Sequence, residues 1–258
     1  MNDMTFHAET RAPIPQSTAV ICSRCVARNA CLPSGIGTLD ILRLDKLVGY
    51  RRRLARDEVL FRKDQPFAMI YAVRFGHLKS SRPDHRGHPH VTGFYMAGEL
   101  LGLDAIYAGR HACTTVALED SEVCEIPYSR FQESMHESLP LMQRFHAALS
   151  HEIVREQNAL LHADMSGAER LATLLLDLSA RYAERGYSGR RFRLRMSRAD
   201  MGNYLGLTIE SISRLLGRFR DEHWIALDKR EIELLDPGRL EALLSAAPGE
   251  PGVSHEEE

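Results

Sequence analysis

The sequence has no long apolar run, and this absence limits what the chain can be. None of its 258 residues belongs to a stretch of about eighteen apolar residues, which excludes a membrane-spanning helix. The first residues contain no apolar segment of the kind that a secretory signal needs, so we expect a cytoplasmic protein. Hydrophobic residues make up 44% and charged residues 26%, the balance of a globular protein that buries a core.

Motifs of common enzyme classes are also missing. The sequence has no phosphate-binding P-loop, no HExxH zinc motif and no recognisable nucleophile–base pattern. We therefore expect no enzymatic activity.

Cysteines are few, and their number is odd. The chain has five, and without a mark of secretion such a set indicates metal or redox chemistry rather than a disulfide framework. Three of them form the pattern Cys22-x2-Cys25-x5-Cys31. Three soft thiolates so close together can bind one metal centre, whose fourth ligand would be Cys113 or Cys124.

Spacing alone leaves three interpretations of these cysteines open. The irregular spacing with a remote fourth thiolate favours an iron–sulfur cluster. Structural zinc sites more often have two C-x2-C pairs or mixed Cys and His ligands, so zinc is a weaker alternative. A thiol switch without metal is the third.

Charge is distributed unevenly along the chain. The formal net charge is only −2, yet the segment from Arg170 to Arg230 holds 13 Lys and Arg against 7 Asp and Glu. A basic C-terminal third on an acidic body is typical of a nucleic-acid-binding domain attached to another domain. A solvated basic face would have the same composition, so charge alone does not decide the matter.

Apolar spacing and turn residues divide the chain into five parts. Residues 1–37 carry the three cysteines on a segment that we expect to be flexible, and the polar tail at 248–258 is expected to be disordered. Residues 38–137 begin with helical spacing, up to about Arg53. Short apolar stretches between Gly, Pro and Asp then predict an antiparallel β sandwich or barrel. Residues 138–166 predict one long helix, and residues 167–247 predict further helices with short strands.

The long helix has a narrow apolar seam without an internal Gly or Pro. Such a seam is typical of a coiled-coil contact, so we expect Leu149, Ile153, Glu156 and Leu160 at a homodimer interface. The alternative is a long helix packed on its own β-domain. Glu156 would meet the same charge on a second subunit, and like charges in a partly buried seam oppose dimerisation.

A helix-turn-helix is predicted over residues 197–220. Ser197 is a good N-cap for a first helix, Gly206 allows a sharp turn, and Thr208 is a good N-cap for a second helix. Such a second helix typically enters the major groove of DNA.

The outer face of the second helix carries side chains that can contact bases. Arg214 can donate two hydrogen bonds to guanine, Glu210 can accept one from cytosine, and Ser213 can contact a base or a phosphate. We therefore expect these three residues to bind double-stranded DNA. The alternative is a structural helical hairpin with a charged outside.

Three stretches of the sequence resemble the CRP/FNR transcription regulators, and within that family the oxygen-responsive FNR branch. They are TGFYMAGELLGLDAI (92–106), SEVCEIPY (121–128) and GNYLGLTIESISRLLGRF (202–219). The E-x-x-S-R pattern of the second helix and the N-terminal cysteine pattern are both similar to motifs of that branch. The resemblance runs from about Cys22 to Leu235. It implies an α+β fold with an N-terminal antiparallel β-roll (a jelly roll of the cyclic-nucleotide-binding type), a long dimerisation helix and a C-terminal winged helix-turn-helix.

The resemblance also implies a function and a ligand set. Proteins of this branch hold an oxygen-labile 4Fe–4S cluster, form homodimers with it, and bind palindromic promoter sites resembling TTGAT-N4-ATCAA. Oxygen degrades the cluster, the dimer weakens, and control of anaerobic gene expression is lost. The branch's fourth ligand precedes Glu-Ile-Pro, so the implied metal ligands are Cys22, Cys25, Cys31 and Cys124.

Two alternatives lack oxygen sensing: a small-ligand receptor and a zinc-stabilised regulator. Relatives that bind cyclic AMP hold its phosphate with an Arg-Ser pair, and the corresponding positions here are His111 and Ala112. Neither can replace an arginine fork and a hydroxyl, so no cyclic nucleotide is expected. Activators of the family contact RNA polymerase through exposed loops, and the histidine-rich segment 81–90 would suit such a contact.

Overall fold

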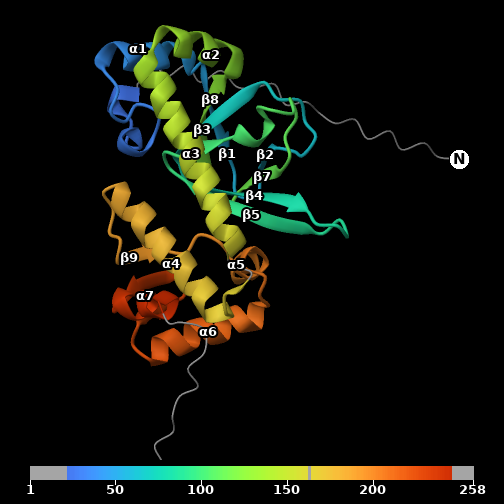
Figure 1. Ribbon diagram of the computed structural model, residues 1–258, viewed down its shortest axis with the longest axis vertical. Coiled ribbons are helices and arrows are strands. Elements are labelled where there is room, and N and C mark those ends of the chain that lie inside the picture. The colour runs from blue at the N-terminus through green and yellow to red at the C-terminus, as the bar shows by residue number, and fades with distance from the viewer. Residues whose placement is uncertain (1–21, 162–163, 246–258) are drawn as a thin grey trace, which may run out of the picture.

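The chain folds into a β-domain and a helical C-terminal domain, with one long helix running between them (Figure 1). The structure is a computed structural model that describes residues 22–161 and 164–245, with the side chains of residues 159–161 left out. The terminal segments expected to be flexible or disordered lie outside the described residues, apart from the cysteine region at 22–37.

Short strands build the β-domain. They are β1 Tyr50–Leu54, β2 Val59–Phe61, β3 Met69–Phe75, β4 His77–Pro83, β5 Pro89–Met96, β6 Leu100–Leu101, β7 Thr114–Ala117 and β8 Ser121–Pro127. Two antiparallel four-stranded sheets result, with the orders β1-β8-β3-β6 and β2-β7-β4-β5. Apolar side chains of both sheets, such as Phe61 and Val123, share one core. The expected antiparallel β-domain is confirmed.

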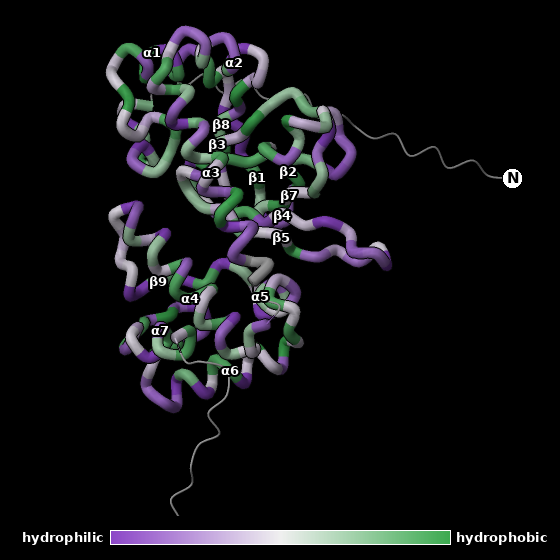
Figure 2. The backbone as a smooth tube through the Cα atoms, in the orientation of Figure 1, coloured by the Kyte–Doolittle hydropathy of each residue, from purple (hydrophilic) through white to green (hydrophobic). Residues whose placement is uncertain are grey.

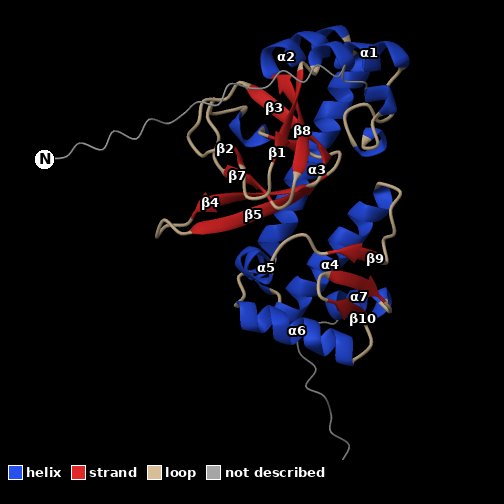
Figure 3. Ribbon diagram, turned by 180° about the vertical axis from the view of Figure 1, so that it is seen from behind, coloured by secondary structure: helices blue, strands red, loops and turns tan. Residues whose placement is uncertain are grey.

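Helices cover one end of the β-domain and lead away from it (Figures 1 and 3). They are the 3-10 turns η1 Cys22–Arg24, η2 Arg28–Ala30 and η3 Leu103–Ala105, and the helices α1 Thr38–Leu47, α2 Tyr128–Glu137 and α3 Leu139–Leu161. Leu44, Phe131 and Phe145 join a second core with β3 and β8. The rings of Phe131 and Phe145 meet edge to face with centroids 5.1 Å apart, which fixes the start of α3 on the β-domain.

Two elements of this domain differ from the sequence prediction. Helical spacing extended to Arg53, whereas α1 ends at Leu47 and β1 begins at Tyr50. The strand was missed because its three consecutive arginines, Arg51 to Arg53, hide the usual alternation of apolar and polar residues. Helix α2 was missed because its only buried residue, Phe131, gives no apolar repeat.

The C-terminal domain contains the expected helix-turn-helix. Its elements are α4 Gly167–Glu184, β9 Arg191–Arg193, α5 Arg198–Leu205, α6 Ile209–Asp221, β10 Ile225–Asp228, β11 Glu231–Leu234 and α7 Pro237–Ser245. The strands form a small sheet in the order β10-β11-β9, the wing beside the two helices. After α6, Trp224 stacks on Phe219 with ring centroids 5.1 Å apart. Helix α7 was not expected, although a proline at the first position, as at Pro237, is a common helix start.

The hairpin of β4 and β5 has a polar, exposed tip. Figure 2 shows a hydrophilic tip on the hairpin of β4 and β5, and residues 82–90 are exposed there. In the part of the chain that the structure describes, none of the helices combines the length and the apolar character that a bilayer crossing demands.

Apolar side chains of β5, namely Val91, Phe94 and Met96, join the core of the C-terminal domain, and polar contacts add to this docking. Lys79 of β4 pairs with Asp200 of α5, and Asn203 Oδ1 accepts a backbone hydrogen bond from β5. The His77 Nε2 atom lies 3.0 Å from the Tyr182 hydroxyl of α4. The first helix of the helix-turn-helix therefore rests on the β-domain, and α6 faces away from it.

Candidate functional site

Four of the five cysteines gather at one small cavity between the N-terminal segment and the β-domain. Cys22 lies in η1, Cys25 and Cys31 follow in the same segment, and Cys124 lies on β8. Cys113 is buried elsewhere, in the core between the two sheets. The structure thus brings together the four cysteines that the resemblance implied and places the fifth apart.

Contacts with three separate elements position these thiols. The Cys22 N–H donates to Asp45 Oδ1 of α1 at 2.5 Å, and Arg144 Nε of α3 donates to the Cys31 carbonyl at 3.4 Å. Cys124 occupies the middle of β8, a strand paired on both sides with β1 and β3. The cysteine segment is therefore bound to the long helix as well as to the sheet.

Burial controls the protonation of these thiols. It raises the pKa of Cys31 to about 12 and that of Cys124 to about 11, and it also raises the pKa of Cys22. Thiols with such values stay protonated at neutral pH, so a metal that binds here must displace protons. The apolar walls that cause this burial include Leu32, Leu44, Val48, Ala72 and Ile126.

The donor set fits an iron–sulfur cluster. Four cysteine thiolates are the usual ligands of a 4Fe–4S cluster. Arg51 and Arg74 lie near Cys124 and oppose the rise of its pKa, so positive charge is available to compensate the thiolates. Among the described residues, no three His, Cys, Asp or Glu side chains lie close enough together to hold a single metal ion.

Caps define both helices of the helix-turn-helix. Ser197 Oγ accepts the Asp200 N–H at 3.0 Å and Asp200 Oδ2 accepts the Ser197 N–H at 3.1 Å, a capping box at the start of α5. Gly206 ends α5 with φ +66°, and Thr208 Oγ1 accepts the Ser211 N–H at 3.1 Å at the start of α6. The predicted caps and turn are confirmed.

The outer face of α6 carries the residues expected to contact DNA. Glu210, Ser213 and Arg214 are exposed, whereas Ile212 and Phe219 are buried on the opposite side. A helix presented in this way can place an arginine fork and a carboxylate against neighbouring base edges.

Three further basic residues beside the helix-turn-helix escaped the sequence analysis. Arg198 at the start of α5 lines a pocket with Lys229 and Arg230 of the β10–β11 turn. Its Nη1 atom is buried without a hydrogen-bond partner among the described residues, and burial together with Arg230 lowers its pKa. Such a pocket favours an anion of the kind that a DNA phosphate provides. The sequence signal was a basic residue at the first helical position and a Lys-Arg pair in the wing turn.

The seam of α3 divides into two halves. Leu149 is half-buried against the core of its own β-domain, so this part packs as the alternative interpretation predicted. Ile153 is 55% exposed and the neighbouring Val154 is 50% exposed, and Glu156 is also exposed. The Leu160 side chain lies outside the described residues. The second half of α3 therefore presents apolar area to solvent, as a dimer contact requires.

Packed side chains fill the positions that correspond to the cyclic-nucleotide phosphate site. His111 is buried and stacks on Phe61 with ring centroids 3.8 Å apart. The Ala112 N–H donates to Asp104 Oδ2 at 2.7 Å. A carboxylate at this place repels a phosphate rather than binding it.

Two known protein families match the two domains of the chain. Residues 51–138 match the cyclic nucleotide-binding domain family, and residues 169–243 match the Crp-like helix-turn-helix domain family. The chain is 40% identical to the transcriptional regulatory protein btr of Bordetella pertussis over 237 residues, 92% of this chain and 98% of that protein. It is 37% identical to the fumarate and nitrate reduction regulatory protein of Escherichia coli K12, covering 84% of this chain and 87% of that protein. The chain belongs to the CRP/FNR family.

Other relatives agree with this assignment. The transcriptional activator protein Anr of Pseudomonas protegens is 39% identical to this regulator, over 86% of this chain and 91% of that protein. The solved structure of FixK2 from Bradyrhizobium japonicum has a TM-score of 0.69 at 26% identity and covers 77% of this chain and 98% of its own. The expected fold of β-roll, long helix and C-terminal helix-turn-helix is confirmed. The regulator is a DNA-binding transcription regulator and not an enzyme.

Proposed function

We propose that this regulator senses oxygen in the cytoplasm through a 4Fe–4S cluster bound by Cys22, Cys25, Cys31 and Cys124. The observation that carries the proposal is the meeting of these four thiols at one apolar cavity. The similarity to a fumarate and nitrate reduction regulator supports it. When bound, the cluster would join the four cysteines through metal–thiolate bonds, and its oxidation by oxygen would end that connection.

The chain's own residues connect this site to α3. Metal–thiolate bonds through Cys124 would tie the cysteine segment to β8 and supply ordering energy. Arg144 of α3 already holds the Cys31 carbonyl, so an ordered segment stabilises one placement of the long helix. We propose that this placement favours association of two copies.

The proposed homodimer forms along the seam of α3. Leu149, Ile153, Glu156 and Leu160 are its interface residues, and the exposed apolar area at Ile153 supports this assignment. Loss of the cluster would weaken the dimer, because the like charges of Glu156 in the two copies oppose it.

Dimerisation would control DNA occupancy. Glu210, Ser213 and Arg214 of each copy bind one half of a palindrome resembling TTGAT-N4-ATCAA. Pairing two helices makes the second contact effectively intramolecular, so a dimer binds far more tightly than a monomer. We propose that the genes controlled are those of anaerobic metabolism, and that the exposed β4–β5 hairpin contacts RNA polymerase.

Anaerobic purification tests this proposal. We expect a brown protein with about four irons per chain, whose visible absorbance bleaches in air while DNA binding falls. The Cys124→Ser variant should lose the iron, and the matched Cys113→Ser variant should keep it. A colourless protein with zinc or no metal, and DNA binding that ignores air, would contradict oxygen sensing and leave a constitutive regulator.

A further inference from the structure

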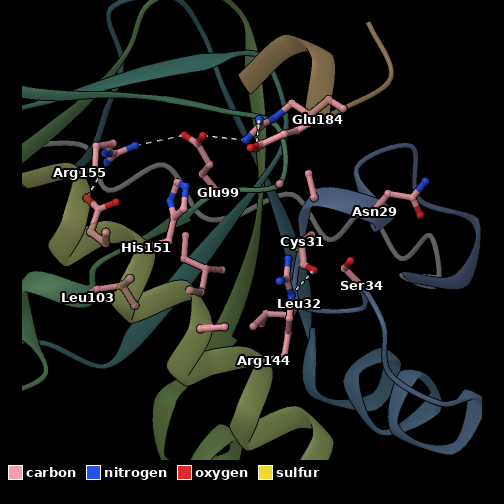
Figure 4. A pocket seen from close by; sticks show the side chains of 17 residues that line it. Asn29, Cys31, Leu32, Ser34, Glu99, Leu103, Arg144, His151, Arg155 and Glu184 are labelled. Atoms are coloured by element: carbon pink, nitrogen blue, oxygen red, sulfur yellow. Dashed lines mark hydrogen bonds and ion pairs between the residues drawn. The ribbon is translucent and has the colours of Figure 1, made fainter. Parts of the chain in front are cut away.

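A second cavity lies on the other side of the cysteine segment. Its volume is about 520 Å³, and its walls come from that segment, the turn between β5 and β6, α3 and the end of α4. Figure 4 shows Cys31 on one wall and Glu99 on another, with Arg155 beside Glu99. The cysteine segment, α3 and the end of α4 therefore meet around one space.

Glu99 is the centre of a buried ion network in this cavity. Its Oε1 accepts hydrogen bonds from Arg181 Nε at 3.0 Å and Arg185 Nη2 at 2.7 Å, and its Oε2 accepts from Arg181 Nη2 at 2.7 Å. Arg155 Nη1 of α3 lies 3.7 Å from Oε2. Burial alone would raise the pKa of Glu99, but the three arginines outweigh it and lower the value to about 2. We call these four residues the Glu99 network.

The Glu99 network attaches the end of α4, and with it the C-terminal domain, to the β-domain. The side chains of Arg181 and Arg185 are only 6% and 7% exposed. Arg181 also donates to the Phe94 carbonyl at 2.7 Å, and Arg185 donates to the Ala97 carbonyl at 2.6 Å. The end of α4 is thereby bound to the backbone carbonyls of β5 and the β5–β6 turn, as well as to the Glu99 carboxylate.

The same turn lies directly against the cysteine segment. Gly98 precedes Glu99 and has φ +94°. A Cβ atom built there would lie 2.7 Å from the Ala30 Cβ and 2.8 Å from the Ala30 carbonyl oxygen. No side chain fits between the two backbones, so the turn at Gly98 lies in direct contact with Ala30, the residue before Cys31.

We propose that Glu99 is a positioning residue through which the cysteine segment sets the orientation of the DNA-binding domain. The inference rests on the proposed function, because it needs a segment whose order depends on the cluster. An ordered segment holds Ala30 against Gly98, and the turn then holds the Glu99 carboxylate where it binds Arg181 and Arg185. Release of the segment frees the turn and loosens the end of α4.

A matched contact elsewhere in the molecule provides the control. Glu119 also joins the two domains, because it lies 2.7 Å from His77 Nδ1 and pairs with Arg195. Among the described residues, its side-chain hydrogen bonds and ion pairs go to His77 and Arg195, and none goes to the cysteine segment. Removing its charge weakens docking, but it leaves the contacts from the cysteine segment through Gly98 to Glu99 in place.

Amide hydrogen exchange in the last turn of α4 tests the inference. Cluster-loaded and cluster-free proteins are compared at residues 181–187, which are the last turn of α4 and the residues that follow it, for the wild type, Glu99→Gln and Glu119→Gln. We expect cluster loss to accelerate exchange by about tenfold in the wild type, a typical size for coupling between sites. In Glu99→Gln exchange should be fast in both states, whereas Glu119→Gln should keep the difference. Iron content should be equal in all three.

Two results would overturn the inference. One is a Glu99→Gln protein that keeps the full difference, and the other is a Glu119→Gln protein that loses it equally. The iron assay distinguishes failure of the proposed function, because a wild type without iron contradicts oxygen sensing before any exchange is measured, and this inference then falls with it. Should Glu99→Gln not fold, Arg185→Gln removes an ion pair of the same Glu99 network. It must then abolish the difference in exchange between the cluster-loaded and cluster-free proteins.

Discussion

A single backbone contact in the helix-turn-helix depends on the absence of a side chain. At Gly202 of α5, an added Cβ would lie 2.5 Å from the Leu207 carbonyl oxygen. The turn between the helices is therefore closed by the close approach of two backbones, in addition to the left-handed residue at Gly206. The sequence analysis found the second glycine from its place between two caps and missed the first, which lies inside a helix.

We predict that Gly202→Ala destabilises the C-terminal domain by about 1–3 kcal/mol, because the backbone has to shift to admit the methyl group. Urea unfolding followed by circular dichroism measures the change. Gly217→Ala on α6 is the matched control, since its Cβ meets nothing within 4 Å. That variant should be neutral or up to about 1 kcal/mol more stable. Equal stability of the two variants would show that the close approach costs nothing.

Arginines on the two sides of the helix-turn-helix should affect DNA binding differently. We predict that Arg214→Ala weakens binding to the palindrome by about 1–3 kcal/mol per half-site and relaxes the preference at one base pair. Arg230→Ala should weaken binding equally for all sequences and reduce the salt dependence of affinity. Fluorescence anisotropy with the palindrome and single-base variants, at several salt concentrations, measures both. A uniform loss for Arg214→Ala would argue against base contact by this residue.

At the scale of elements, α3 belongs partly to its own domain and partly to solvent. Its first turns are fixed by Phe145 on Phe131, and its later turns expose Ile153 and Val154. Apolar spacing predicted the helix and its seam. It could not show where the seam leaves the β-domain, because α2, which binds the first turns, has no apolar repeat of its own.

We predict that Glu156→Ala makes the cluster-free protein dimeric in air, because it removes the like charges that would face each other across the proposed seam. Gln157→Ala is the control on the same exposed turn and should leave the protein monomeric. Sedimentation velocity over a range of concentrations distinguishes the two states. A monomeric Glu156→Ala protein would mean that another force keeps the copies apart.

At the scale of the whole molecule, the domains are joined by charges as well as by apolar contacts, since Val91, Phe94 and Met96 of β5 belong to the core of the C-terminal domain. The Glu99 network lies near the cysteines, and His77, Glu119 and Arg195 form a second charged group between the domains. Both groups depend on side chains that are far apart in the sequence and carry no periodic signal. Sequence analysis therefore predicted each domain and three of the clustered cysteines, and the resemblance to a family added Cys124. It assigned no role to Glu99 in joining the domains.

We predict that docking of the two domains weakens in acid. The pKa of Glu99 falls from 4.5 in its ordinary state to about 2 in the folded protein, so its contribution is complete above pH 4.5 and disappears as the pH drops toward 2. The linked free energy is about 3 kcal/mol. Small-angle scattering between pH 6 and pH 2 measures the separation of the domains, and Glu99→Gln should lack the part of the transition that Glu99 causes. An identical acid profile for both proteins would assign the transition to other carboxylates.

Trp224, stacked on Phe219, is an intrinsic fluorescence probe. The chain has one tryptophan, and it lies immediately after α6, on the ring of a residue buried in that helix. Emission excited at the red edge of indole absorption therefore originates in the DNA-binding domain alone. The proposed loosening of this domain can be followed there without any added dye, and a change in the signal that precedes dissociation of the proposed dimer would give the order of the two steps.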